Sequence, residues 1–280
     1  MKRYPDVPRV EDAPDGFLER GHLWIEEKVD GDLLRFSMGD DGVLSFGDAE
    51  RTYGPSDVPP ALEYAVRHVR ENFDRGSFAR EVEAPASVAF FGVAVHRRRV
   101  DYDWRRTPPF LGFDVWSAGR DAFLPPDAAE RAFDALGLRP IDVFEKEVEA
   151  AYFDPASYEI PRSNWYDGPA AGVVLKNKTG DRAQIVRPDL RGDDPDPAGD
   201  ASSAGPTELA ERYVTPDLVD SVRANLESGS TPATFEATYR QTLDFVSRAA
   251  HPAVFDGDVD PREFRSAVAA RCREYFERSA

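Results

Sequence analysis

Residues 24–36, WIEEKVDGDLLRF, place a lysine at the end of an apolar stretch. The chain has only five lysines among 280 residues, and Lys28 is followed by Asp30 and Gly31 in the pattern Lys-x-Asp-Gly. A lysine amine becomes a nucleophile when burial and nearby cations lower its pKa from about 10.4. Lys28 is therefore a candidate for covalent catalysis. The simpler interpretation is a surface lysine at a strand end.

Two further stretches concentrate basic residues. Residues 95–106 hold five arginines and a histidine, and residues 175–187 hold two lysines and two arginines. Because phosphate contacts need Lys and Arg, both stretches are candidates for binding nucleotides or nucleic acid. The alternatives are a solvated charged face and, for lysines on an exposed strand edge, protection against edge-to-edge pairing.

The chain as a whole is acidic, with 52 Asp and Glu against 35 Lys and Arg and a net charge of −17. An acidic surface repels the phosphates of nucleic acid, so the overall charge argues against a nucleic-acid partner. Such a partner would have to bind at the two basic stretches. Arginine outnumbers lysine 30 to 5. We expect a halophilic protein, since a Debye length of roughly 3 Å at molar salt weakens repulsion between carboxylates. A GC-rich genome is the alternative explanation.

Several classes of protein are disfavoured by the sequence. The single cysteine, Cys272, allows neither a disulfide framework nor a CxxC metal site, and the four histidines share no ligand spacing. No stretch approaches the roughly 20 apolar residues of a membrane helix. The first residues show no apolar core of a signal peptide. We therefore expect a cytoplasmic protein that does not bind membranes.

Apolar periodicity and turn residues predict the elements that would position these side chains. Strands are expected at residues 22–29, 33–38, 43–47, 87–95, 110–116, 171–178 and 182–188. Helices are expected at residues 59–74 and 125–138, and again after residue 206, where Thr215-Pro216 and Asp260-Pro261 have the form of helix starts.

This layout predicts two domains. Residues 1–190 form an α+β domain and residues 207–280 form a small all-helical domain. Residues 191–206 are rich in Gly, Pro, Asp, Ser and Ala without an apolar period, which is typical of a flexible linker.

The motifs occur in a definite order: Lys-x-Asp-Gly, Arg35, FFG at residues 90–92, FDVW at 113–116, and AGVVLK at 171–176 before a basic strand. This series resembles the covalent nucleotidyltransferase superfamily of ATP-dependent ligases and capping enzymes, and within it the short RNA ligases. The resemblance implies an ATP-grasp-like ligase domain built from antiparallel sheets with flanking helices. It also implies ATP and Mg²⁺ or Mn²⁺ as cofactors and RNA (or DNA) ends as partners.

The resemblance also implies roles for individual residues. Lys28 would attack the α-phosphorus of ATP and form a lysyl-AMP intermediate. Glu27 would face the adenine edge, Phe113 would stack on the base, and Asp30 and Gly31 would shape the turn. The remaining roles concern phosphate and ribose: Arg35 for the nucleotide, Lys176 and Arg182 for its phosphates, and Arg51 for the nucleic acid. Apart from the resemblance, the basic stretch makes Arg97, Arg98 and Arg99 candidates for binding the nucleic acid.

Three positions depart from the pattern of that family. Val93 follows FFG where the family has glutamate, Ala171 replaces the glutamate of the next motif, and Gln184 replaces a lysine. Losing carboxylates weakens Mg²⁺ placement, and losing a cation at the reacting phosphate costs on the order of 10² to 10³ in rate. Asp101, Asp103 and Asp114 are candidates to supply a carboxylate, and the metal ligands stay open.

The leading hypothesis is an ATP-dependent RNA ligase of RNA repair that seals 5′-phosphate to 3′-hydroxyl ends. A helical domain in place of a β-rich one after residue 206 points away from DNA ligases and capping enzymes. The alternative is a catalytically degenerate homologue that binds nucleotide or RNA without sealing. Guanylyl transfer to RNA ends is a third hypothesis, and the oligomeric state stays open.

Overall fold

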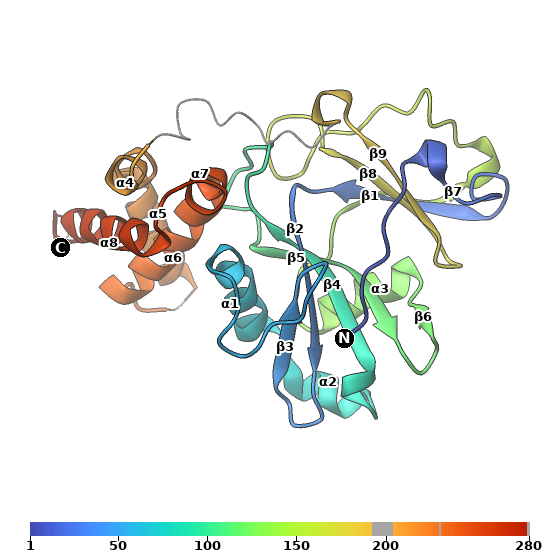
Figure 1. Ribbon diagram of the computed structural model, residues 1–280, viewed down its shortest axis with the longest axis horizontal. Coiled ribbons are helices and arrows are strands. Elements are labelled where there is room, and N and C mark those ends of the chain that lie inside the picture. Colours follow the sequence, from blue (N-terminus) through green and yellow to red (C-terminus); the bar gives the residue numbers. More distant parts are fainter. Residues whose placement is uncertain (192–203, 230, 279–280) are drawn as a thin grey trace. The chain divides into compact units, whose positions relative to one another are not determined.

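The computed structural model describes residues 1–191, 204–229 and 231–278, which fall into two compact units. One unit contains residues 1–95 and 107–191 (Figure 1). The other contains residues 96–106 and the described residues from 204 onwards. Most of the expected linker, residues 192–203, lies outside the described residues. Residues 96–106, which we expected in the first domain, group with the helical unit instead.

The first unit is built on two antiparallel sheets. The four-stranded sheet has the order β7-β1-β8-β9 and the five-stranded sheet has the order β3-β2-β4-β5-β6. The strands of the first are β1 (His22–Lys28), β7 (Val143–Glu149), β8 (Gly172–Asn177) and β9 (Arg182–Val186). The strands of the second are β2 (Gly31–Met38), β3 (Leu44–Gly47), β4 (Val88–Val95), β5 (Phe110–Ser117) and β6 (Ala122–Phe123).

Helices cover the five-stranded sheet and bury its apolar face. They are α1 (Glu63–Asn72), α2 (Arg75–Glu81) and α3 (Pro126–Ala135). Elsewhere in this unit, short 3₁₀ turns lie at Val10–Asp12, Pro60–Leu62, Pro85–Ser87, Ala150–Tyr152 and Pro188–Leu190. The helical period places Val66 and Val69 of α1 and Phe133 of α3 in one core with Phe36 and Phe90 of the sheet. This packing confirms the expected antiparallel sheets with flanking helices.

Two pairs of consecutive strands form hairpins, whereas β1 and β2 do not. Strands β2 and β3 pair around a turn at Gly39–Gly42, and β8 and β9 pair around Thr179–Asp181. Strands β1 and β2 follow one another closely but belong to different sheets. The chain therefore passes from one sheet to the other directly after Lys28, which puts that lysine at the junction of the two sheets.

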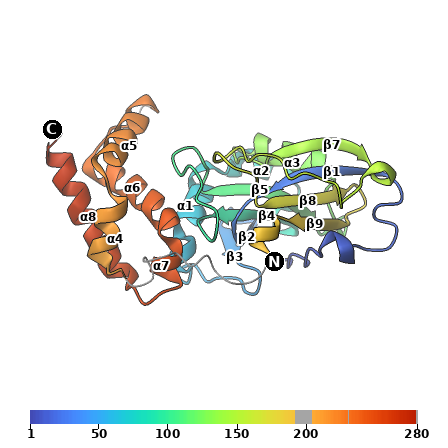
Figure 2. The same cartoon turned by 90° about the horizontal axis from the view of Figure 1, so that it is seen from above.

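Five helices make up the described part of the second unit after residue 203. They are α4 (Pro206–Tyr213), α5 (Pro216–Ser228), α6 (Phe235–Ala249), α7 (His251–Phe255) and α8 (Pro261–Arg278). Figure 2 shows α4, α6 and α8 side by side, and their apolar faces share one core that includes Phe264, Val268 and Cys272. The expected starts are confirmed: Thr215 caps α5, and Asp260 accepts the amide of Arg262. No described helix is long and apolar enough to cross a membrane.

Candidate functional site

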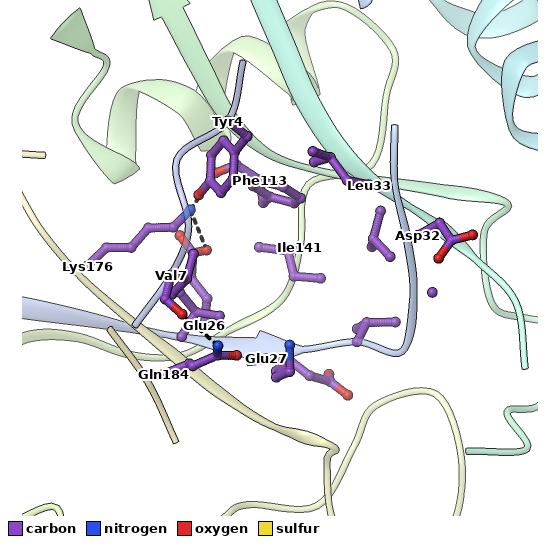
Figure 3. A pocket seen from close by; sticks show the side chains of 15 residues that line it. Tyr4, Val7, Glu26, Glu27, Asp32, Leu33, Phe113, Ile141, Lys176 and Gln184 are labelled. Atoms are coloured by element: carbon purple, nitrogen blue, oxygen red, sulfur yellow. Dashed lines mark hydrogen bonds and ion pairs between the residues drawn. The ribbon is translucent and has the colours of Figure 1, made fainter. Parts of the chain in front are cut away.

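A cavity of about 250 Å³ lies at the junction of the two sheets in the first unit (Figure 3). Strand β1 contributes Glu26, Glu27 and Lys28, and the five-stranded sheet contributes Phe113 and Val93. The complete lining is Tyr4, Val7, Glu26, Glu27, Lys28, Val29, Gly31, Asp32, Leu33, Val93, Phe113, Ile141, Val174, Lys176 and Gln184. The cavity therefore has apolar walls with charged groups from β1 and β8.

Lys28 is the last residue of β1 and is half-buried at the cavity wall. Its Cα lies opposite Gly172 of β8 in the antiparallel ladder. A Cβ at that glycine would lie 2.2 Å from the carbonyl oxygen of Ile185, so only glycine fits beneath the lysine. The buried residues Leu23 and Ile25 anchor the same strand in the core and hold its end in place.

Gly31 is the first residue of β2 and follows the last residue of β1, Lys28, by three positions. The backbone conformation at this position requires glycine. Its φ is +148°, and a Cβ would lie 2.3 Å from the carbonyl oxygen of Ala94 and 2.8 Å from Val93. The glycine at the fourth position of Lys-x-Asp-Gly thus allows β2 to approach β4 closely beside the cavity. Asp30, by contrast, lies in the connection between the strands and does not line the cavity.

Replacing Gly31 with alanine is expected to lower the free energy of unfolding by on the order of 2 kcal/mol, because the backbone is strained and the Cβ collides with β4. Urea denaturation measures this loss. Gly42→Ala is the matched control, since Gly42 also has a positive φ but nothing lies within 4 Å of its Cβ position. An equal loss in both variants would mean that the close approach to β4 contributes nothing.

Buried charges form an ion network beside the cavity. The Nζ of Lys176 lies 2.7 Å from Oε2 of Glu26 and 3.3 Å from Oδ1 of Asp114, and it donates to the carbonyl oxygen of Phe113 at 2.6 Å. Arg182 lies 3.3 Å from Oδ2 of Asp114. The hydroxyl of Tyr4 donates to the same carboxylate, and Figure 3 shows Lys176 pointing toward Tyr4 and Glu26.

The carboxylates of this network pair with most of the positive charge that β8 and β9 bring to the cavity. Lys176 is only 3% exposed and faces two carboxylates, while Arg182 packs over the ring of Phe123 at 4.2 Å and does not line the cavity. Burial raises the pKa of Glu26 to about 7, and the ammonium of Lys176 opposes that rise. Lys176 therefore reaches the cavity with its charge already paired.

Glu27 lies on the other side of β1 from this network and is 2% exposed. Its Oε1 accepts the hydroxyl of Ser163 at 2.6 Å, and its Oε2 lies 3.5 Å from the backbone nitrogen of Asn164. Burial raises the pKa of this carboxyl to about 7, against the lowering effect of the bond from Ser163. Near neutral pH the group can thus accept hydrogen bonds as a carboxylate or donate one as an acid.

The raised pKa of Glu27 predicts a pH-dependent stability. A carboxyl whose pKa is higher in the folded state stabilises the protein below its ordinary pKa, and that contribution is lost as pH rises through about 7. Glu27→Gln is expected to remove the loss. It should unfold less readily than the wild type at pH 8.5, by on the order of 2 kcal/mol, with a smaller difference at pH 5.

Thermal denaturation at both pH values measures the effect. Glu149→Gln is the control, since Glu149 is exposed on the neighbouring strand β7. Glu26 titrates in all three proteins, so the comparison isolates Glu27. A wild type and a Glu27→Gln variant with the same pH dependence would contradict the assignment.

Residues 1–9 form an N-terminal strap that crosses the cavity and contacts both sheets. Arg35 of β2 binds the carbonyl oxygens of Met1 at 3.3 Å and Lys2 at 2.6 Å. Gln184 of β9 donates to the carbonyl oxygen of Val7 at 2.7 Å. Arg35 is 2% exposed and does not line the cavity. The family resemblance assigned Arg35 to the nucleotide, and the family has a lysine at the position of Gln184. In this chain both residues hold the strap.

The structure therefore gathers only some of the residues singled out in the sequence. Glu27, Lys28, Gly31, Phe113 and Lys176 line the cavity, as do Val93 and Gln184 at the departing positions. The others lie elsewhere: Asp30 in the β1–β2 connection, Arg35 and Arg182 in buried polar contacts, Arg51 with its side chain 68% exposed near Asp48, and Arg97, Arg98 and Arg99 in the other unit.

Several lining residues were missed in the sequence. Ile141 and the strap residues Tyr4 and Val7 reach the cavity from segments without a motif, and Glu26 lies two residues before Lys28 but outside the Lys-x-Asp-Gly pattern. Glu26 adjoins Glu27, and two consecutive buried carboxylates in an apolar strand were the one available signal. Asp114 was considered as a carboxylate for a metal, but it is 1% exposed and engaged by Lys176, Arg182 and Tyr4. Asp101 and Asp103 lie in the other unit.

Comparison with known proteins bears on the fold. No protein-family model and no curated protein matches the sequence. Among solved structures, an archaeal ATP-dependent RNA ligase aligns with a TM-score of 0.51 at 15% identity, covering 100% of this chain and 74% of that chain. A mutant of Naegleria gruberi RNA ligase with ATP and Mn aligns with a TM-score of 0.52 at 11% identity, covering 68% and 57%.

A further structure, Naegleria gruberi RNA ligase with PPi, aligns with a TM-score of 0.51 at 12% identity, covering 66% of this chain and 56% of that chain. The chain thus spans little more than half the length of the Naegleria ligase. At these identities the likeness establishes the fold, which is the nucleotidyltransferase fold of RNA ligases that the motif order led us to expect.

Proposed function

We propose that this chain is an ATP-dependent RNA ligase-like nucleotidyltransferase that carries AMP on Lys28. The observation that supports it best is the position of Lys28, at the wall of a cavity between two sheets, beside Glu27 and Phe113. The fold is shared with an archaeal ATP-dependent RNA ligase and with a Naegleria gruberi RNA ligase studied with ATP and Mn.

The proposed reaction has three steps. Lys28 attacks the α-phosphorus of ATP as a neutral amine, and its nitrogen releases a proton as the P–N bond forms and the bond to pyrophosphate breaks. An oxygen of an RNA 5′-phosphate then attacks the same phosphorus and breaks the P–N bond. Finally, a 3′-hydroxyl attacks the activated 5′-phosphate and releases AMP.

The cavity residues divide this work between them. The apolar wall of Val93, Leu33 and Ile141 excludes water around the base, and the ring of Phe113 offers a stacking face. Glu27 would hydrogen-bond to the base edge in either protonation state. Lys176, held by Glu26, lies close to the ring of Phe113, at 5.3 Å from its centroid. Through its bond to the carbonyl oxygen of Phe113, Lys176 fixes the position of β5, and it adds no net charge to the cavity.

Carboxylates at the cavity supply the oxygen ligands that a divalent cation needs. Glu26 and Asp114 face Lys176 and Arg182, and Asp32 is a further carboxylate that lines the cavity. Mg²⁺ is commonly held by one or two carboxylates together with substrate phosphates. Such a cation would neutralise charge on the triphosphate, and Asp32 with the phosphates would hold it.

A specific observation favours a second candidate, a homologue that binds nucleotide or RNA without sealing. Val93 is an apolar lining residue where the family has glutamate, and Gln184 binds the N-terminal strap where the family has lysine. Both substitutions remove groups that would act on the nucleotide.

Incubation of the purified chain with α-labelled ATP and Mg²⁺ or Mn²⁺ at high salt tests the proposal. We expect covalent label on the protein, released as AMP when 5′-phosphorylated RNA with a 3′-hydroxyl partner is added. Stronger competition by GTP than by ATP would favour guanylyl transfer instead. Measurable RNA binding without any covalent label would support the non-sealing homologue.

A further inference from the structure

The helical unit contains a cavity of its own, of about 290 Å³, beneath the arginine-rich loop 96–106. The loop supplies five consecutive lining residues, and α4, α5 and α6 supply the opposite wall. The complete lining is Asp101, Tyr102, Asp103, Trp104, Arg105, Tyr213, Thr215, Leu218, Phe245, Val246 and Ala249. Aromatic rings are thus brought together from segments more than 100 residues apart.

The indole of Trp104 is fixed in position at this cavity. Its Nε1 donates to Oδ1 of Asp101 at 2.8 Å, and its ring meets the edge of Tyr102 with centroids 5.7 Å apart. The guanidinium of Arg248 lies 5.1 Å from the Trp104 ring, is 1% exposed and does not line the cavity. Arg248 therefore supports the ring from outside the cavity, which leaves the half-buried indole as a preorganised cavity wall.

The loop carboxylates beside this cavity already serve internal contacts. Asp101 holds Trp104, and Asp103 accepts the backbone nitrogen of Arg105 at 3.2 Å and pairs with Arg106 at 3.4 Å. No described residue pairs with the guanidinium of Arg105, which is exposed at the cavity. The rim therefore offers, among the described residues, a guanidinium without an ion-pair partner next to an aromatic wall.

We propose that this cavity binds an unpaired base of single-stranded RNA, with Arg105 on an adjoining phosphate. Base stacking on aromatic side chains tolerates any base, and arginine contacts supply the phosphate attraction. The choice of RNA as the nucleic acid rests on the proposed function. The ring set also resembles a cage for an organic cation, but the guanidinium of Arg105 at the cavity repels a cation and attracts a phosphate, which favours the base.

Fluorescence anisotropy with a labelled single-stranded RNA tests the proposal. Trp104→Ala is expected to weaken binding by roughly 5- to 100-fold, the effect of losing one base–aromatic stack, while Trp104→Phe keeps most of the affinity. Arg105→Glu should also weaken binding and lower the salt dependence by about one counterion. Arg262→Glu on α8 makes the same charge change on an exposed arginine away from the cavity and should bind nearly as the wild type.

An RNA of equal length with abasic residues separates stacking from phosphate contacts. The wild type is expected to bind it as weakly as Trp104→Ala does, and Trp104→Ala should not distinguish the two RNAs. Equal affinity of the wild type for both RNAs would overturn the proposal, as would competition by tetramethylammonium at constant ionic strength. A wild-type affinity in a folded Trp104→Ala variant, judged by thermal denaturation, would do the same.

The same preparations, assayed for covalent AMP, keep the two proposals apart. Trp104→Ala should form the adduct on Lys28 at the wild-type rate, because its cavity lies in the other unit. Trp104-dependent RNA binding without any adduct would refute the lysyl-AMP proposal and support the RNA site. An adduct with Trp104-independent RNA binding would refute only the RNA site.

Discussion

Lys28→Ala is expected to abolish covalent labelling of the protein by ATP. The amine at position 28 is the nucleophile in the proposed reaction, and loss of a catalytic nucleophile can lower turnover by on the order of 10⁶. Lys28→Arg should be as inactive, because a guanidinium keeps the positive charge but is never deprotonated in proteins. The measurement is α-labelled ATP followed by denaturing gel electrophoresis, with the labelled peptide identified by mass spectrometry.

The controls for this result use the same unit. Lys178 is two residues beyond Lys176 and forms an exposed ion pair with Glu147 at 2.7 Å. Lys178→Ala should label like the wild type. Thermal denaturation of both Lys28 variants should show intact folding, since the side chain is half-buried at the end of a strand. Label that persists in Lys28→Ala would place the nucleophile elsewhere and remove the basis of the proposed mechanism.

Lys176→Met is expected to cause the largest loss of stability. The change leaves Glu26 and Asp114 buried at 4% and 1% exposure without their shared ammonium partner. Breaking a buried ion pair by removing one partner typically costs about 3–5 kcal/mol. The burial that raises the pKa of Glu26 to about 7 acts without the opposing effect of Lys176 in this variant. The loss should therefore grow as pH rises and shrink as Glu26 becomes protonated.

Urea denaturation at pH 5.5 and pH 8 measures both the loss and its sign. Adding Glu26→Gln to Lys176→Met should restore part of the stability at pH 8, because it removes the buried charge that has lost its ion-pair partner, whereas Asp114 keeps Arg182. Lys178→Met, the exposed neighbour on the same segment, should leave the unfolding midpoint unchanged within error. A Lys176→Met variant that unfolds like the wild type at pH 8 would show that the network is not coupled through this lysine.

The sequence contained enough local information for the strands and helices that build the cavity. The apolar stretch before Lys28, the glycine at position 31 and the apolar period of α1 are short-range signals, and the structure follows them. Strand β7 escaped detection because its sequence, VFEKEVE, is charged at most positions and lies largely exposed. Its pairing with β1 comes from the neighbouring strand and not from its own pattern.

The partners of charged side chains could not be read from the sequence. Arg35 and Arg182 are correct residue types for binding phosphate, yet one binds backbone carbonyls of the strap and the other binds Asp114. Both outcomes depend on contacts between residues more than 30 positions apart. The same holds for residues 96–106, whose grouping with helices after residue 203 is set by tertiary packing.

The N-terminal strap has a practical consequence for recombinant work. Arg35 binds the carbonyl oxygens of Met1 and Lys2, and Tyr4 and Val7 further along the strap form part of the cavity wall. An affinity tag fused ahead of Met1 would disturb the contacts that hold the strap and, through them, the cavity wall. Tags placed after residue 280, or cleaved without leaving extra residues before Met1, avoid this artefact.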